Sequence, residues 1–177
     1  MAVIPENSND IQANAFGLLA RRVRATGDGE PIEVHNPVDG SVIGSIPRCR
    51  PVDVISAVER ARAAQAEWGA LTFRARGRVL ARFHDLVLKR QNEILDIIQL
   101  ENGKTRIQAF EEVLATANTA SYYAYSARGY LKNRHRAGAM PLLTSTIEAR
   151  RPRGVIGFIT PWNYPLTMGI TDALAAL

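Results

Sequence analysis

The chain has 177 residues, a length typical of one domain or of one domain with an appendage. Hydrophobic residues make up 46% and charged residues 22%, a balance that excludes an intrinsically disordered chain. No apolar stretch approaches the roughly 20 residues that cross a bilayer. The opening MAVIPENSNDIQ lacks the basic region and apolar core of a secretory signal. We therefore expect a globular protein in the cytoplasm, without a membrane partner.

The formal net charge of +5 makes nucleic-acid binding the first alternative function. Basic residues cluster in three places, at 21–24, 132–136 and 149–154. These clusters are scattered, aromatic residues do not alternate with them, and no helix-turn-helix, RRM or zinc-finger spacing occurs. We prefer to interpret them as a surface that faces solvent or another subunit, and we predict no nucleic-acid partner. A basic nucleic-acid-binding domain stays an alternative.

The cysteine and histidine content argues against a metal site. Cys49 is the single cysteine, which excludes an intrachain disulfide and a cysteine-based zinc site. Two arginines flank it, but no His, Asn or Asp pattern accompanies it, so we interpret it as an ordinary loop thiol. None of His35, His84 and His135 has a partner at ligand spacing, and we predict no bound metal.

The apolar pattern predicts a hairpin followed by helices. Residues 1–20 carry little pattern and are expected to form a tail or a lead-in helix. Alternating apolar residues on both sides of the turn-forming NPVDG predict a β-hairpin over 31–47. Helical spacing then predicts four helices, at 52–68, 73–90, 92–102 and 105–130, the third ending at an Asn-Gly stop.

Each predicted helix has an apolar side without a polar cluster on it, so we expect all four helices to be structural. In the helix over 52–68 that side includes Val54, Val58 and Trp68. In the helix over 105–130 it is rich in small residues, which permits close packing. It consists of Ile107, Phe110, Leu114, Ala117, Ser121, Ala124 and Tyr125.

The period of the pattern changes to two from Met140 onward. In LLTSTIEARR the alternating side chains are too polar for a central strand, and they indicate an exposed arm. We assign residues 134–152 to this arm, with His135 in a basic loop at its start. An exposed strand edge can pair with another subunit.

A nearly continuous apolar run, 155–159, predicts a buried parallel strand covered on both faces. In open α/β sheets, ligands bind beyond the carboxyl ends of such strands. The sequence TPWNYP occupies that position and places Asn163 at the mouth of a binding cleft. No G-x-G-x-x-G or P-loop follows the strand, so motifs alone define only a strand-end loop stiffened by two prolines.

The stretch RRPRGVIGFITPWNYPL closely resembles the aldehyde dehydrogenase superfamily. NPVDGSVIGSIP and LENGKTRIQAFEEV are weaker matches in the right order, so the resemblance covers nearly all of 31–177. The residues that match the family pattern P-x-G-V-(I/V)-G-x-I-x-P-W-N-(F/Y)-P are Pro152, Gly154, Val155, Ile156, Gly157, Ile159, Pro161, Trp162, Asn163, Tyr164 and Pro165.

This resemblance implies an α/β fold, the N-terminal part of a Rossmann-like cofactor domain with an incomplete sheet. It divides the chain into a tail, the hairpin and helices of the cofactor-binding domain, an oligomerisation arm, and the first Rossmann strand with the PWN loop and the start of the next helix. The corresponding ranges are 1–20, 21–133, 134–152 and 153–177.

The resemblance also implies NAD(P)-dependent oxidation of an aldehyde to a carboxylic acid. In that chemistry a cysteine thiolate attacks the aldehyde, hydride passes to NAD or NADP, and a glutamate assists thioester hydrolysis. Asn163 would donate its side-chain NH₂ to the developing oxyanion, since an amide donates without titrating. Ile159, Thr160, Pro161 and Trp162, together with Asn163, would line the nicotinamide-ribose end of the cofactor. The structural alternative is that Trp162 and Asn163 only plug a strand-to-helix turn.

Within the superfamily, the chain is most similar to bacterial succinate-semialdehyde dehydrogenases of the actinobacterial type. A semialdehyde enzyme is expected to carry an arginine eight positions after the motif Asn to meet the substrate carboxylate. Thr171 stands there, followed by Asp172, and this departure counts against an acidic substrate.

The chain is far shorter than the family's full chain. The nucleophilic cysteine, the base glutamate, the cofactor-binding lysine and the glycine-rich turn would lie after Leu177. We therefore expect an N-terminal fragment that is inactive alone and forms a homo-oligomer, a dimer or tetramer, in its full-length form. A non-catalytic truncated relative that acts as a binding or assembly piece is the other alternative.

Overall fold

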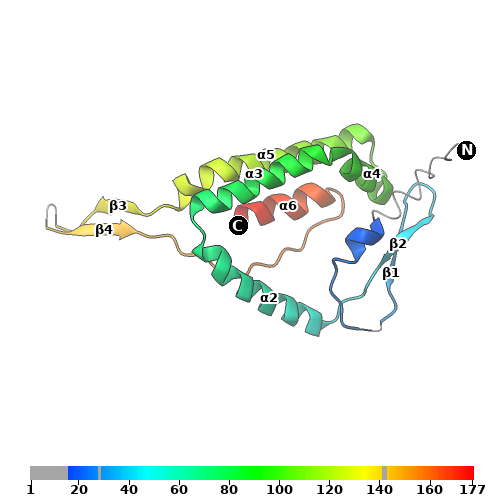
Figure 1. The fold of residues 1–177 in the computed structure, drawn as a ribbon, viewed down its shortest axis with the longest axis horizontal. Helices are drawn as coiled ribbons and strands as arrows, with labels where there is room; N and C mark the ends of the chain where they lie inside the picture. Colours follow the sequence, from blue (N-terminus) through cyan, green and yellow to red (C-terminus); the bar gives the residue numbers. More distant parts are fainter. Residues whose placement is uncertain (1–15, 28, 141–142) are drawn as a thin grey trace, which may run out of the picture.

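A computed structural model describes residues 16–27, 29–140 and 143–177. Most of the predicted tail over 1–20 lies outside the described residues, and 16–20 form a short helix. The elements that follow are β1 (Ile32–His35), β2 (Val42–Ile46), α2 (Pro51–Ala70), α3 (Phe73–Lys89), α4 (Gln91–Asn102), α5 (Arg106–Leu131), β3 (Arg134–Ala137), β4 (Ser145–Glu148) and α6 (Pro165–Ala176) (Figure 1).

The predicted hairpin over 31–47 is confirmed. Strands β1 and β2 pair antiparallel with Ile32 opposite Ile46, and a register shift lies between Val34 and His35. In the turn, the Asn36 side chain accepts the Val38 N–H at 2.9 Å, which is the local bond that favours Asn in turns. The four predicted helices are also confirmed, with ends within a few residues of the expected ones.

Helices α3, α4, α5 and α6 pack together into one helical body (Figure 1). The most extensive contact joins α3 and α5, and it depends on Gly77, where an added Cβ would come within 2.5 Å of the Ala124 carbonyl oxygen. The body's buried apolar residues are Leu80, Val87, Leu95, Ile98, Ala109, Val113, Ala117, Ala120 and Leu174. Among the described residues, no helix is both long enough and apolar enough to cross a membrane.

The predicted apolar side was wrong for α2 and, except at the buried Ala117, largely wrong for α5. In α5, Ile107 is 77% exposed and Phe110 and Leu114 are also exposed, whereas the buried side carries small residues and the polar Glu112 and Thr116. Close approach of α3 favours small side chains, so Val113 and alanines fill the buried side and most of the larger apolar residues of α5 face outward. The apolar residues of α2 are largely exposed because no helix of the described chain packs extensively against α2.

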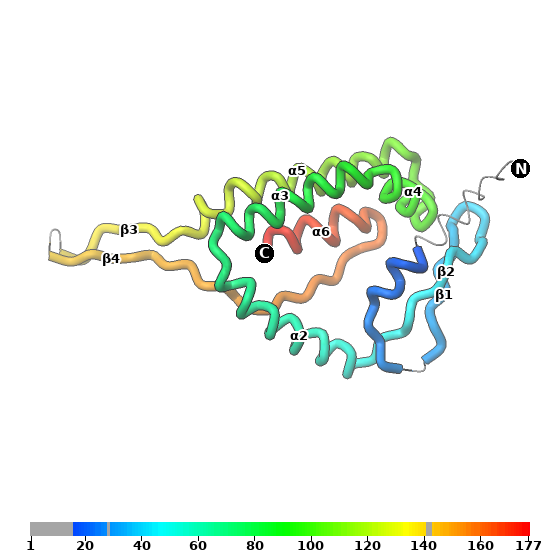
Figure 2. The backbone as a smooth tube through the Cα atoms, viewed as in Figure 1, coloured from blue at the N-terminus to red at the C-terminus, as the bar shows by residue number. Residues whose placement is uncertain are grey.

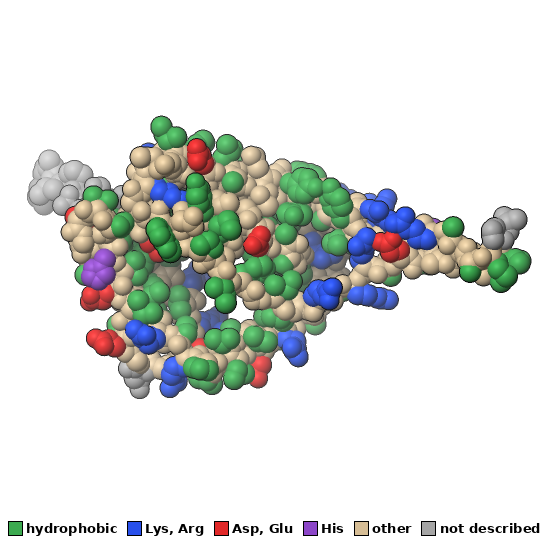
Figure 3. Space-filling view, turned by 180° about the vertical axis from the view of Figure 1, so that it is seen from behind, with side chains coloured by type: hydrophobic (Ala, Val, Ile, Leu, Met, Phe, Trp, Pro, Cys, Tyr) green, Lys and Arg blue, Asp and Glu red, His purple; other side chains and the backbone are tan. Residues whose placement is uncertain are grey.

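The predicted arm is a two-stranded antiparallel ribbon that projects away from the body (Figures 1 and 2). Residues 134–137, predicted as a basic loop, form its strand β3, which pairs with β4 so that Arg134 lies opposite Glu148. Figure 3 shows Lys and Arg side chains gathered where the arm leaves the body. Arg136 and Arg150 both bind the Glu148 carboxylate there, at 2.7 and 2.5 Å.

The prediction of a buried strand over 155–159 is wrong for the described structure. Residues 149–161 have no regular secondary structure and run as a single extended segment from the arm to α6 (Figure 2). Ile156, Phe158 and Ile159 are exposed, Ile159 fully so. A parallel strand is buried only when neighbouring strands and covering helices flank it, and both described sheets are two-stranded and lie elsewhere.

Candidate active site

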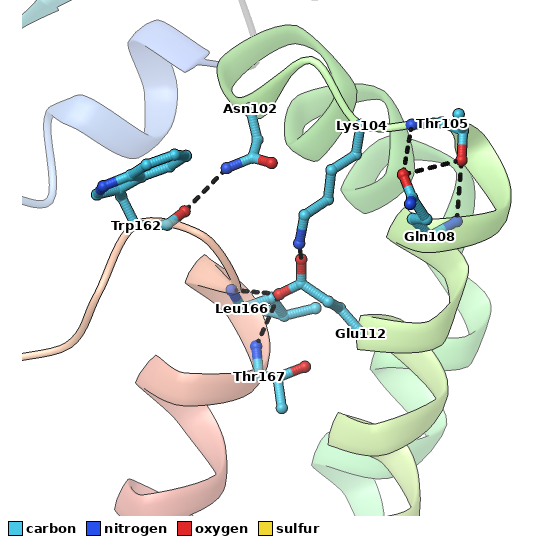
Figure 4. Close-up of polar contacts among 8 residues, drawn as sticks. All are labelled: Asn102, Lys104, Thr105, Gln108, Glu112, Trp162, Leu166 and Thr167. Atoms are coloured by element: carbon cyan, nitrogen blue, oxygen red, sulfur yellow. Dashed lines mark hydrogen bonds and ion pairs between the residues drawn. The ribbon is translucent and has the colours of Figure 1, made fainter.

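The PWN loop, residues 160–164, lies between the end of α4 and the start of α6 (Figure 4). Helix α4 ends at Asn102 because Gly103 adopts a left-handed conformation with φ of 72°. From that end, the Asn102 side-chain amide donates to the carbonyl oxygen of Trp162 at 2.8 Å. One side chain of the helical body therefore holds the backbone of the loop directly before Asn163.

A second side chain of the body holds the other end of the loop. The Glu112 carboxylate, on α5, accepts the N–H groups of Leu166 and Thr167 at 3.0 and 3.1 Å (Figure 4). Pro165 has no N–H, and Met168 donates to the Tyr164 carbonyl at 2.9 Å, so every first-turn amide of α6 is accounted for. Tyr164 at the N-cap supplies no side-chain cap, and Glu112 takes that role from 54 residues away.

The Glu112 side chain is fully buried, and its charge is compensated on two sides. Lys104 places its Nζ 2.5 Å from Glu112 Oε1, and only 12% of the Lys104 side chain is exposed. The other carboxylate oxygen faces the positive end of the α6 helix dipole. The same Lys104 Nζ lies 3.7 Å from the centroid of the Tyr164 ring, a cation–π contact.

A hollow of about 450 Å³ adjoins the loop. It brings together the hairpin, the end of α4 and the PWN loop. Partial desolvation raises the pKa of the Glu101 carboxyl there, although the residue as a whole remains exposed. Its lining residues are Val34, Glu101, Asn102, Thr160, Pro161, Trp162 and Pro165.

The predicted site residues divide into two groups. Thr160, Pro161 and Trp162 line the hollow, although Trp162 remains 80% exposed. Ile159 and Asn163 are exposed and lie outside its lining. Asn163 is thus not packed into hydrocarbon, and none of the bonds that hold the loop uses its side-chain amide.

A larger groove of about 800 Å³ lies at the other end of the body, between α3, α5 and the end of α6. None of the predicted site residues lines this groove, and the candidate site therefore lies at the PWN loop. Cys49 lines neither the groove nor the hollow. It is exposed, and its Sγ lies 4.0 Å from the carbonyl oxygen of Arg24.

Sequence reasoning missed three residues of this arrangement: Asn102, Lys104 and Glu112. Asn102 was predicted only as part of a helix stop, and the expectation that the buried helix faces carry no polar cluster did not anticipate the buried Glu112. The E-x-G-K stretch and the acidic residues after it carried the available signal, but pattern alone does not show which acidic residue turns inward.

The sequence profile of the aldehyde dehydrogenase family matches residues 23–177. The chain belongs to the aldehyde dehydrogenase family. The match includes the hairpin, the helical body, the arm and the PWN loop, so the elements that build the loop's surroundings all fall within the family's shared sequence.

Relatives and solved structures agree with this assignment. A putative succinate-semialdehyde dehydrogenase [NADP(+)] 2 of Mycobacterium ulcerans is 38% identical over 85% of this chain and 29% of its own length. The aldehyde dehydrogenase of Brucella melitensis biovar abortus is 32% identical with a TM-score of 0.80, over 87% of this chain and 32% of its own. An NAD-dependent benzaldehyde dehydrogenase of Corynebacterium glutamicum is 32% identical with a TM-score of 0.77, over 87% and 34%.

The fold is therefore that of part of an α/β aldehyde dehydrogenase with small, incomplete sheets. The chain spans about 29% of the length of the M. ulcerans relative.

Proposed function

We propose that this chain supplies the oxyanion-donor loop of an NAD(P)-dependent aldehyde dehydrogenase, which oxidises an aldehyde to a carboxylic acid. The observation that carries the proposal is the PWN loop, in which Asn163 is exposed while the residues on both sides of it are bonded to the helical body. A loop that only plugged a turn would bury its Trp, whereas Trp162 is 80% exposed.

Asn163 has the chemistry that this role requires. When a nucleophile adds to an aldehyde, the carbonyl oxygen gains negative charge, and a fixed neutral N–H donor stabilises that charge without changing its own protonation. The prolines at 161 and 165 each restrict φ, so the donor approaches the reacting oxygen with little reorganisation.

For the cofactor we propose NAD or NADP, as the names of the M. ulcerans and C. glutamicum proteins state for those enzymes. When bound, the nicotinamide accepts hydride from the substrate. The exposed Ile159 and Trp162 offer apolar surface to such a ring, and Thr160 offers a hydroxyl at the edge of the hollow. These residues fit the nicotinamide-ribose end, and the sequence 1–177 holds no glycine-rich phosphate turn for the other end.

For the substrate we propose succinate semialdehyde, which the names of relatives at 36–38% identity support. Thr171 does not act as a carboxylate anchor in this structure, because its hydroxyl is bonded to the Thr167 carbonyl within α6 at 2.7 Å. A residue outside 1–177 would then have to bind the substrate carboxylate.

The test is the formation of NAD(P)H by the protein at its natural length, with succinate semialdehyde, benzaldehyde and propanal compared. We expect Asn163→Ala to lower kcat by about 10²–10³. Unchanged kcat in Asn163→Ala would remove the oxyanion assignment. We expect the 177-residue chain alone to give no turnover, and clear turnover would contradict the assignment of the nucleophile and base to residues outside it.

We further infer that the arm pairs across a subunit boundary in a cytoplasmic homo-oligomer. Its unpaired strand edges and its projection from the body support this inference. Light scattering should show a smaller particle when 134–152 is shortened. A salt-dependent gel shift would instead favour the nucleic-acid alternative, although two arm arginines already pair with Glu148.

A further inference from the structure

We propose that Asn102 and Glu112 are positioning residues for Asn163, which fix the loop on both sides so that the amide stays free and aimed. The proposal rests on the proposed function, since it assigns a purpose to residues that act through Asn163. In this proposal both residues act on the backbone of the loop and not by contact with substrate or cofactor.

The first step concerns the backbone immediately before Asn163. The Trp162 carbonyl and the Asn163 N–H belong to one peptide group, which is planar. By holding that carbonyl at 2.8 Å, Asn102 fixes the plane that leads into the Asn163 Cα. Asn102 is itself the last residue of α4 and lies against the body, so the restraint has a rigid origin.

The second step concerns the backbone after Asn163. Glu112 accepts two successive N–H groups, from Leu166 and Thr167, and so fixes the position and the direction of the first turn of α6. Its side chain is 0% exposed and comes from the buried face of α5, so it is closed off from solvent. A carboxylate in this place is restrained by the packing of α5 against α6.

The third step concerns Tyr164, which lies between Asn163 and the two amides that bind Glu112. Tyr164 lies under the Lys104 ammonium at 3.7 Å, and the same ammonium binds Glu112. Lys104 follows Asn102 by two residues, so one short segment at the end of α4 reaches both sides of the loop (Figure 4). Asn163 is therefore exposed between restrained neighbours on both sides, which is the arrangement an aimed donor needs.

The first experiment measures loop order by hydrogen–deuterium exchange in the protein at its natural length. We expect Asn102→Ala and Glu112→Gln to speed exchange in peptides that cover 160–168 at least about five-fold, because amides freed from bonds or restraint exchange from the open state. The matched controls are Asn118→Ala and Glu111→Gln, exposed positions on α5 that should leave those peptides unchanged. Unchanged exchange in both Asn102→Ala and Glu112→Gln would overturn the proposal.

The second experiment asks whether Asn102 acts through Asn163. A misplacement of about 1 Å in a reacting group can cost about 10² in rate, so we expect Asn102→Ala to lower kcat about ten-fold with KM nearly unchanged. In an Asn163→Ala background, the same change should lower kcat less than two-fold, because the group being positioned is gone. Asn102→Gln, which keeps a donor, should recover part of the loss.

An equal loss of kcat in both backgrounds would show a general structural role and would overturn the proposal. If Asn163→Ala itself leaves kcat unchanged, the proposed function fails, and hydrogen exchange still decides whether the two residues restrain the loop. Because Asn102 lies at the end of a helix and is half-buried, its replacement tests the idea even where a Glu112 variant does not fold.

Discussion

The helical body and the stretch from β3 to the PWN loop differ in where their partners lie. In the body, α3, α4, α5 and α6 bury apolar residues against one another, although several large apolar side chains of α3 and α5 stay exposed. In the stretch 149–161, an equally apolar run is exposed as a single extended segment. The apolar pattern of a segment therefore indicates that the segment is suited to burial, but it does not show whether the element that would cover it is present.

The PWN loop follows the exposed stretch in the sequence, but its hydrogen bonds are made to the helical body. Its own local sequence supplies prolines but no cap for α6, while Asn102, Lys104 and Glu112 of the body supply the bonds. The comparison thus predicts that the loop depends on body residues more than on its own, and replacing those residues should have the largest effects.

Glu112→Ala should be the most destabilising single change. It leaves a nearly buried Lys104 ammonium without its partner and two α6 N–H groups without an acceptor. Breaking a buried pair in this way typically costs about 3–5 kcal/mol. Urea unfolding should show this loss, whereas Glu111→Ala at the adjacent exposed position should change the unfolding free energy by less than about 0.5 kcal/mol. Equal, small effects of the two would show that α6 does not need Glu112.

Much of the fold could be predicted from the sequence because its signals are local. The hairpin follows from NPVDG, and the end of α4 follows from Gly103, whose left-handed φ of 72° suits glycine. In the helix predicted over 92–102, the apolar pattern consists of Ile94, Leu95, Ile97 and Ile98, and of these Leu95 and Ile98 are buried.

What could not be predicted depends on distant partners. Most of the buried side of α5 was missed because close packing selects Ala109 and Ala120 over the larger Ile107, a choice set by the neighbouring helices and not by α5 itself. Likewise, the PWN sequence identified the loop, but the cap from Glu112 is a contact over 54 residues that no spacing rule reveals.

Gly77→Ala should have the next largest effect, and it tests the close approach of α3 to α5. The added Cβ would meet the Ala124 carbonyl oxygen at 2.5 Å, and backbone cannot give way cheaply. Overpacking of this kind typically costs about 1–3 kcal/mol. Gly129→Ala is the matched control on α5: its Cβ meets nothing within 4 Å, and Ala favours a helix over Gly by about 1 kcal/mol, so thermal denaturation should shift upward. Shifts of the same sign would contradict the close-packing explanation.

The smallest expected effect lies outside the body, at the start of α2, and appears only on acidification. Asp53 accepts the Thr26 hydroxyl and backbone N–H as well as the Arg50 N–H, and these bonds, the hydroxyl first, hold the pKa of its carboxyl below the ordinary value.

Because the folded pKa is lowered, the stabilisation by Asp53 is present above the ordinary carboxyl pKa of about 4 and is lost as pH falls through the folded value. Asp53→Asn should remove that part of the pH dependence, so wild type and variant should converge in stability below about pH 4. The exposed Asp172→Asn, on α6, serves as the control that keeps it. No described helix packs extensively against α2. Protonation of Asp53 should therefore free the start of α2 from residue 26 and leave the packing of the body unchanged. If the body unfolds together with α2, the two regions are not separate.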